Sequence, residues 1–289
     1  MHALPDGRLL LAFSGGPDSV GLAARLRDRR PLLAYVDHRL RGSRAGRAER
    51  LRVKTHAAAL GLPLVRARVA LDSGSEAVAR RARYDALHAL AAKHGCCALV
   101  TAHTADDRAE TIWLNLQRGA GLRGIAALKP DACFDGLARL RPALDERRAT
   151  LHDAARVFLP VHDRTNRATR YARARARALG LPALALRLGE DPVPLLCALG
   201  DLAAALRAAL EDRAAGLRDA ATRHTLLDEC GASFPYLVEA LRGAGPPLTR
   251  NAYASLRDFL RAGRTGRTHV TPGGDAWTLR RGGGVEVES

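Results

Sequence analysis

Cysteine and long apolar runs are both scarce in this sequence of 289 residues. The five cysteines are odd in number, include no C-x-x-C pair and are too few for a secreted disulfide scaffold, so we expect reduced, mostly buried thiols. No apolar run approaches the roughly 20 residues that span a bilayer, and the first residues lack a basic segment followed by an apolar one. These absences predict a cytoplasmic protein without membrane contact.

Negative charge is also in short supply, and lysine is almost missing. Aspartate and glutamate number 30 against 46 lysines and arginines, which gives a net charge of +16, and lysine occurs only at positions 54, 93 and 129. Such a surplus favours a polyanionic partner such as nucleic acid. A general bias towards arginine on every surface would produce the same surplus, so charge alone leaves both explanations open.

Short apolar runs alternate with amphipathic stretches from residue 8 to about residue 130. We expect strands at 8–13, 31–36, 63–69 and 97–101, and helices at 19–29, 44–61, 75–94 and 105–118. This order predicts an α/β fold, with a parallel, Rossmann-like sheet covered by helices on both faces. In such sheets, ligands bind beyond the carboxyl ends of the strands.

The alternation stops after Pro130. We expect one further strand at 137–144, arginine-rich helices up to residue 181, more helix at 192–261, and a small hairpin from 268–271 and 276–280. The predicted organisation is a catalytic domain at 1–182 and a smaller, mainly helical domain at 183–289 that ends in the hairpin.

A glycine turn at 14–19 joins the first expected strand to the first expected helix. Gly15 and Gly16 let the backbone bring its N–H groups close to an anion, and Pro17 suits the first turn of a helix, whose N-terminus attracts phosphate. The hydrolytic P-loop has a lysine after its glycines, whereas this turn carries the carboxylate of Asp18. An ordinary glycine-rich turn is the alternative.

Two further groups of polar residues follow expected strands. Asp37 and His38 come after the second strand and could contact a ribose or a base, although a loop histidine without a role is equally compatible. Asp107 and Glu110 are three residues apart, so on a helix they share a face and could bind an ammonium group or a metal ion. Helix capping and solvation are the alternative for this pair.

Several segments together resemble the tRNA(Ile)-lysidine synthetase family, whose turn is the PP-loop of the ATP pyrophosphatases. The matching segments are SGGPDS at 14–19, VDHRLR at 36–41, ARRARY at 79–84, AHTADDRAET at 102–111, RGAGL at 118–122, RPAL at 141–144 and DRTN at 163–166, with Arg148, Arg173 and Arg177. The resemblance is nearly continuous over 8–182 and weaker beyond, where LTRNAY at 248–253 and the hairpin look like a tRNA-binding domain.

The resemblance implies a reaction and its cofactors. ATP would activate the wobble cytidine of a tRNA(Ile) with a CAU anticodon through an adenylated intermediate, and free L-lysine would then replace AMP at C2 to give lysidine. ATP would be bound by Ser14, Gly15, Gly16, Pro17, Asp18, Ser19, Val36, Asp37, His38 and His103. Mg²⁺ would bind at Asp18, because hard cations prefer oxygen ligands.

The resemblance also implies which residues take part in the reaction. Besides Asp18, these would be Asp107 and Glu110 for the lysine ammonium, and Arg173 and Arg177 for the lysine carboxylate or tRNA phosphates. Arg173 and Arg177 lie four apart and share a helix face, and a solvated face is the alternative. His103 would contact phosphate or order its loop.

Some residues depart from the family pattern, and some functions remain as alternatives. The family usually has glutamine at Arg108, asparagine at Ala174 and a Gly-Met pair at 127–128. A PP-loop tRNA thiolase and a non-catalytic nucleotide- or RNA-binding module are the alternative functions. The oligomeric state is open, with a homodimer as one option.

Overall fold

The computed structural model describes residues 2–37, 43–69, 76–126, 128–134, 136–158, 172–217, 226–227, 234–242, 248–272 and 274–288. It divides into two compact units, residues 1–200 and 201–289. Each unit has hydrophobic core residues of its own.

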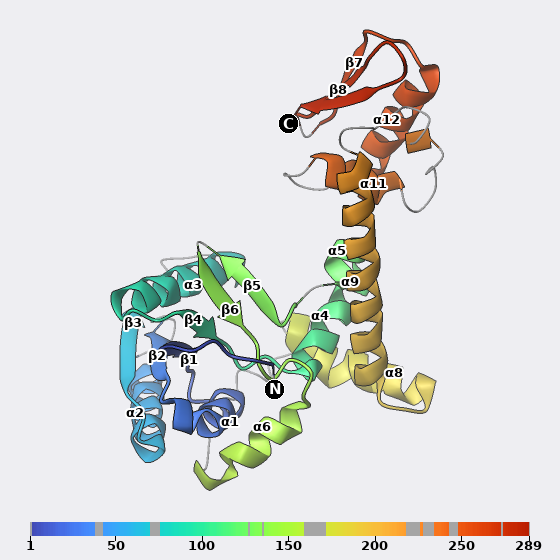
Figure 1. Cartoon of the computed structure of the whole chain (residues 1–289). Helices are drawn as coiled ribbons and strands as arrows, with labels where there is room; N and C mark the ends of the chain where they lie inside the picture. The colour runs from blue at the N-terminus through green and yellow to red at the C-terminus, as the bar shows by residue number, and fades with distance from the viewer. Residues whose placement is uncertain are drawn as a thin grey trace. The chain divides into compact units, whose positions relative to one another are not determined.

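A six-stranded sheet forms the centre of the first unit (Figure 1). Its strands are β1 (Leu9–Ala12), β2 (Leu32–Asp37), β3 (Leu64–Arg68), β4 (Ala98–Val100), β5 (Asp131–Phe134) and β6 (Leu137–Leu140), in the order β3-β2-β1-β4-β6-β5. All neighbours pair in parallel except β5, which pairs antiparallel with β6 at the edge. The predicted α/β fold is confirmed. Strand β5 was not predicted, because its residues 131–133 are exposed and lack an apolar pattern.

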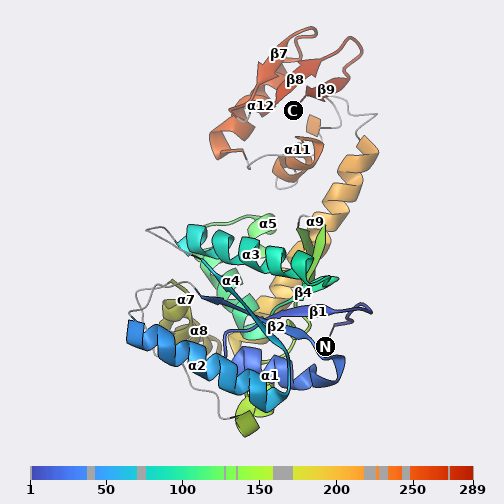
Figure 2. The ribbon, with the colours of Figure 1, turned by 90° about the vertical axis from the view of Figure 1, so that its left-hand side faces the viewer.

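The helices that follow along the chain are α1 (Pro17–Arg25), α2 (Ser43–Leu60), α3 (Glu76–Lys93), α4 (Ala105–Gln117), α5 (Leu122–Ile125), α6 (Arg148–Ala155), α7 (Ala172–Arg175), α8 (Leu181–Leu188) and α9 (Pro192–Leu217), with 3-10 turns at Arg27–Arg29 and Arg156–Phe158 and a π-helical turn, η4, at Ala176–Gly180. Helices α1, α2 and α6 pack on one face of the sheet and α3 on the other. Figure 2 shows α3 on one side of the strands, and α1 and α2 on the other.

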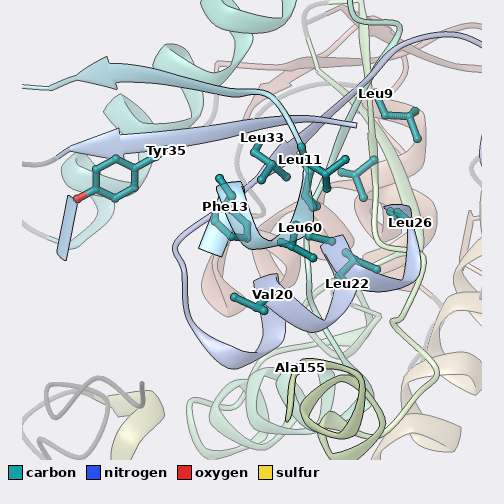
Figure 3. Packing of buried hydrophobic residues seen from close by; sticks show 14 of the residues in the cluster. Leu9, Leu11, Phe13, Val20, Leu22, Leu26, Leu33, Tyr35, Leu60 and Ala155 are labelled. Atoms are coloured by element: carbon teal, nitrogen blue, oxygen red, sulfur yellow. The ribbon is translucent and has the colours of Figure 1, made fainter. Parts of the chain in front are cut away.

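Alternating side chains of the strands form two hydrophobic cores. Leu9, Leu11 and Leu33 point towards α1, α2 and α6, and Figure 3 shows this side. Leu10 and Leu32 point the opposite way, towards α3. These leucines are 0–2% exposed. Each buried leucine contributes about 2 kcal/mol to stability. The two cores together fix the carboxyl ends of the strands, which the polar loops follow.

The first unit extends past the predicted boundary near residue 182. Leu181 and Val193 belong to a third core with Ala105, Ala109 and Ile112 of α4. Because this apolar face packs on α4, α8 and the start of α9 belong to the first unit, up to Gly200.

The second unit begins within α9, whose residues after Gly200 belong to it. Its described residues also form α11 (Phe234–Arg242), α12 (Arg250–Ala262), and a small sheet of β7 (Thr268–Val270), β8 (Ala276–Leu279) and β9 (Val285–Glu288), with antiparallel order β7-β8-β9. The fully buried Trp277 of β8 lies in the core with Leu256 and Leu260 of α12. The expected hairpin is thus present, and it is extended by a third strand that the sequence did not predict.

One apolar helix and the exposure of the cysteines bear on the expectations from the sequence. The segment Pro192–Arg213 of α9 is long and apolar enough to cross a membrane by length and composition alone, although charged residues interrupt its apolar run. Among the described cysteines, Cys96 is buried but Cys97 and Cys133 are exposed. The thiols are therefore not mostly buried.

Candidate active site

The turn at 14–19 follows β1 and is held by its own backbone and hydroxyl groups. Gly15 has a φ of 72°, and an added Cβ would come within 3.1 Å of Val53, so glycine is required there. The hydroxyls of Ser14 and Ser19 share a hydrogen bond at 3.2 Å, and Ser19 also donates to the carbonyl of Gly16 at 3.0 Å. Helix α1 starts at Pro17, and no side-chain hydrogen bond caps it. The first N–H groups of α1 are therefore available to an anion.

Asp18 in the first turn of α1 contacts two side chains of α6. His152 Nε2 donates to its Oδ1 at 2.8 Å, and Arg148 Nε lies 3.7 Å from its Oδ2. Burial raises the pKa of Asp18, although Arg148 and His152 oppose this. Since Arg148 and His152 are four residues apart, one face of α6 carries both groups.

Arg148 also reaches the two predicted carboxylates of α4. Its Nη2 donates to Asp107 Oδ1 at 2.8 Å and to Glu110 Oε1 at 3.2 Å. Arg177 donates to both oxygens of Glu110, from Nε at 2.7 Å and from Nη2 at 3.0 Å. The structure therefore brings Asp18, Asp107, Glu110 and Arg177 together around Arg148. We call Asp18, Asp107 and Glu110 the acidic cluster.

Positively charged and hydrogen-bonding groups surround the three carboxylates. The carboxylates form ion pairs with the guanidinium groups of Arg148 and Arg177, and Asp18 also contacts His152. Arg173 lies beside them and donates to the Thr111 hydroxyl at 3.2 Å. Each carboxylate of the acidic cluster therefore has a partner within the network.

Asp107 both caps α4 and belongs to the acidic cluster. Its Oδ2 accepts hydrogen bonds from Thr104 N at 3.0 Å and Thr104 Oγ1 at 2.9 Å, while Oδ1 faces Arg148. Burial opposes ionisation of Asp107, but Arg148 and the Thr104 hydrogen bonds outweigh it and lower the pKa. Asp107 can therefore cap α4 and also belong to a binding site. Capping uses Oδ2, whereas Oδ1 faces the acidic cluster.

The other predicted residues lie at the ends of neighbouring strands. His103 Nδ1 is 2.9 Å from Thr101 Oγ1, and burial together with nearby arginines lowers the pKa of His103 to about 3, so its ring is neutral at physiological pH. Val36 and Asp37 are buried at the end of β2, where Arg50 Nη1 lies 3.3 Å from Asp37 Oδ2. His38 lies outside the described residues.

Helix α6 completes the network, although its sequence predicted no role for it. Its position depends on Gly21, because a Cβ on that residue would overlap the backbone oxygen of Leu151. Asp106 also anchors α6, by accepting a hydrogen bond from Arg148 N at 2.7 Å. Arg148 appeared in the family match, but no spacing in the sequence pointed to His152 or Gly21. Arg108, where the family usually has glutamine, is buried, and its Nη1 lies 3.8 Å from Asp145 Oδ1.

The donor set fits a magnesium ion that shares its coordination with phosphates. The described residues contain no group of three or more candidate metal ligands. Mg²⁺ is usually bound through one or two carboxylates and substrate phosphates, and Asp18 beside the glycine turn matches that requirement.

Comparisons with known proteins place the chain in a family. The PP-loop domain matches residues 1–184. The tRNA(Ile)-lysidine synthase of Salinispora arenicola is 39% identical over 84% of this chain and 76% of its own length. The enzyme of the same name from Novosphingobium aromaticivorans is 40% identical over 60% of this chain and 56% of its length, and that from Streptomyces coelicolor 40% over 69% and 59%.

A solved structure shows the same fold. The U34-tRNA thiolase NcsA from Methanococcus maripaludis, with its [4Fe-4S] cluster, matches 69% of this chain and 72% of its own with a TM-score of 0.53 and 14% identity. At 14% sequence identity, this similarity shows only that the two chains share a fold. The matches cover less than two thirds of the length of most of these synthases, but the Salinispora arenicola match covers 76%. The chain therefore belongs to the tRNA(Ile)-lysidine synthase family of proteins with a PP-loop domain.

Proposed function

We propose that this protein ligates free L-lysine to C2 of the wobble cytidine in a tRNA(Ile) with a CAU anticodon. ATP is consumed, and AMP and pyrophosphate are released. The observation that carries the proposal is the network in which Arg148 of α6 joins Asp18 beside the glycine turn to Asp107 and Glu110 of α4. This network links a phosphate-binding turn to an anionic site.

In the first step the glycine turn binds the phosphates of ATP. The backbone N–H groups at the start of α1 and the hydroxyls of Ser14 and Ser19 hold the β- and γ-phosphates. The C2 oxygen of the cytidine attacks the α-phosphorus, the bond to the β-phosphate oxygen breaks, and pyrophosphate leaves. Asp18 would hold Mg²⁺ there, and the ion would supply positive charge against the leaving pyrophosphate.

In the second step lysine binds at the acidic cluster. An ε-ammonium group needs an anionic partner, and the carboxylates of Asp107 and Glu110 provide it. A carboxylate accepts the proton that the ammonium loses, and the free amine attacks C2 of the activated cytidine while AMP leaves. Arg173 or Arg177 pairs with the lysine carboxylate, since a guanidinium fork matches two carboxylate oxygens.

The cytidine has to leave its stacked position to reach this site. Enzymes that act on a base generally extrude it from the stack. The net charge of +16 supplies attraction for the phosphate backbone of the tRNA. The arginines between residues 139 and 177 and the second unit would position the tRNA.

Incubation with ATP, Mg²⁺, labelled lysine and a CAU-anticodon isoleucine tRNA tests the proposal. We expect label in the tRNA and lysine-dependent AMP formation. A folded methionine tRNA, which has the same anticodon, and an isoleucine tRNA with a GAU anticodon are the controls and should stay unlabelled. Label that remains free with all three RNAs would refute the ligase and leave a nucleotide- or RNA-binding module.

A further inference from the structure

A pocket of about 510 Å³ is lined by residues of α4, α7, η4 and α8. Trp113 of α4 and Leu184 of α8 are half-buried residues that form its apolar part. Arg175 and Arg187 also line it and are exposed, so the pocket opens to solvent. Its volume lies in the range of about 300–1,000 Å³ that is usual for sites that bind small molecules or single chemical groups. We call it the Trp113 pocket.

The indole of Trp113 is held between the protein core and the pocket. Trp113 packs against the third core, which contains Ile112 and Val193, and it also lines the pocket. A Cβ on Gly180 would come within 2.5 Å of Trp113 Nε1, so the π-helical turn approaches the indole closely only because residue 180 is glycine. Turns of this type are frequent at functional sites. The two contacts make the ring a firm platform for a planar ligand.

The Trp113 pocket adjoins the candidate active site. Glu110, Trp113 and Gln117 are spaced by three and four residues, so they lie along one face of α4. With a rise of about 1.5 Å per residue, Trp113 follows Glu110 by about 5 Å along the helix axis. The facing wall is shared as well, because Arg177 of η4 pairs with Glu110 whereas Gly180 of the same turn lines the pocket. Ligands at the acidic cluster and in the pocket would therefore be neighbours.

The side chains of the Trp113 pocket match a nucleobase. Proteins that bind unpaired RNA stack its bases on aromatic rings and on guanidinium planes, and amide side chains hydrogen-bond to base edges. Trp113 supplies the ring, Arg175 and Arg187 supply the planes, and Gln117 supplies the amide. A guanidinium group that is ion-paired still presents its flat face, so stacking does not require unpaired charge.

We propose that the Trp113 pocket binds the base of a nucleotide next to the cytidine that enters the active site. The inference rests on the proposed function. A cytidine that leaves its stack also deprives the neighbouring bases of a stacking partner. The pocket, about one helical turn from Glu110, gives one of these bases a new partner. Binding there holds the RNA strand while the cytidine reacts.

Tryptophan fluorescence and RNA affinity test this site. The chain has two tryptophans, and Trp277 is fully buried in the second unit. A CAU anticodon stem–loop should quench the emission of the natural protein, because the bound base contacts the Trp113 indole. W113L should lose this quenching and bind the RNA about tenfold more weakly, whereas W113F keeps a ring and should bind within about threefold of the natural protein. L186A, which changes a side chain of α8 that is 87% exposed and lies outside the pocket, is the control.

Abasic RNAs identify the ligand. An abasic site 5′ or 3′ of the cytidine removes one flanking base from the stem–loop. One of the two should weaken binding to the natural protein, W113F and L186A by about tenfold, but should not weaken binding to W113L. Equal losses in all four proteins would overturn the proposal. Quenching by ATP alone, with the same RNA affinity in W113L as in the natural protein, would assign the pocket to a free nucleotide and also overturn it.

These readouts need no turnover, so they separate this site from the ligase reaction. RNA that binds to the natural protein without quenching Trp113 refutes the pocket and leaves the proposed function intact. The expected quenching and abasic losses in a protein that does not label its tRNA would support the pocket and refute the ligase alone.

Discussion

The acidic cluster and the Tyr84 arginine cluster, in which Arg80, Arg83 and Arg139 lie over the Tyr84 ring, have their charges arranged in opposite ways. In the acidic cluster each carboxylate has an arginine partner, and Glu110, which is 1% exposed along its side chain, has two. In the Tyr84 arginine cluster guanidinium groups face one another around a ring. The first arrangement pairs opposite charges, whereas the second brings like charges close together. Substitutions should therefore have opposite effects on stability.

The largest effect is expected for Glu110→Gln. The substitution leaves Arg148 and Arg177 without their shared carboxylate, and breaking a buried ion pair costs about 3–5 kcal/mol. Because Arg177 is partly exposed, we expect the free energy of unfolding, measured by urea denaturation, to fall by about 3 kcal/mol. Glu211→Gln, which breaks the exposed pair with Arg207, is the matched control. Glu211→Gln should lower the free energy of unfolding by less than about 1 kcal/mol. Similar losses in both variants would contradict the distinction between the buried and the exposed ion pair.

Asp107→Asn should separate lysine use from ATP binding. The amide oxygen can still accept hydrogen bonds from Thr104, so α4 keeps its cap. The proposed anionic partner of the lysine ammonium is lost. We expect lysine-dependent turnover to fall about a hundredfold, while the ATP dissociation constant stays near that of the natural protein. Steady-state kinetics with varied lysine check this. Unchanged lysine KM and turnover would refute the assignment.

His103 lies between the two clusters and should make stability depend on pH. Its folded pKa of about 3 is below the usual value, so the unfolded chain binds the proton first as the pH falls. Stability is therefore lost on acidification from about pH 6.5, by at most about 1.4 kcal/mol per pH unit. His103→Gln should remove this slope, and urea denaturation at pH 7 and pH 5.5 measures it. Parallel curves for both proteins would show that the ring is not held neutral.

The smallest effect is expected for Arg83→Gln in the absence of ligand. Removing one of several like charges should leave the free energy of unfolding unchanged or raise it by about 0.5 kcal/mol. The sign is opposite to that of Glu110→Gln, and the same urea titration measures both. Arg66→Gln, at an exposed position of β3, controls for the change in net charge. A loss of more than about 1 kcal/mol would mean that Arg83 has a stabilising partner.

The elements that the sequence predicted have local signals. Apolar runs marked β1 to β4, the glycine turn marked the start of α1, and the three-residue spacing placed Asp107 and Glu110 on one face of α4. These features depend on residues that are close along the chain, so a periodic pattern or a turn motif is enough to find them.

The missed features depend on contacts between distant segments. His152 meets Asp18 across 134 positions, and Arg139 reaches the Tyr84 ring from another element. No local pattern contains such a contact. The later domain boundary has the same origin, because Leu181 belongs with the first unit only through its packing on α4.

Gly21 has a consequence for how mutations of this protein are interpreted. It lies inside α1, where glycine costs about 1 kcal/mol relative to alanine, and a Cβ there would overlap the backbone of Leu151. Any side chain at position 21 must displace α6 and, with it, Arg148 and His152. In a mutational scan, substitutions of Gly21 would therefore lower activity as substitutions of the proposed site residues do, although Gly21 carries no reactive atom. Loss of activity in such a scan identifies residues that position a site as well as residues that react.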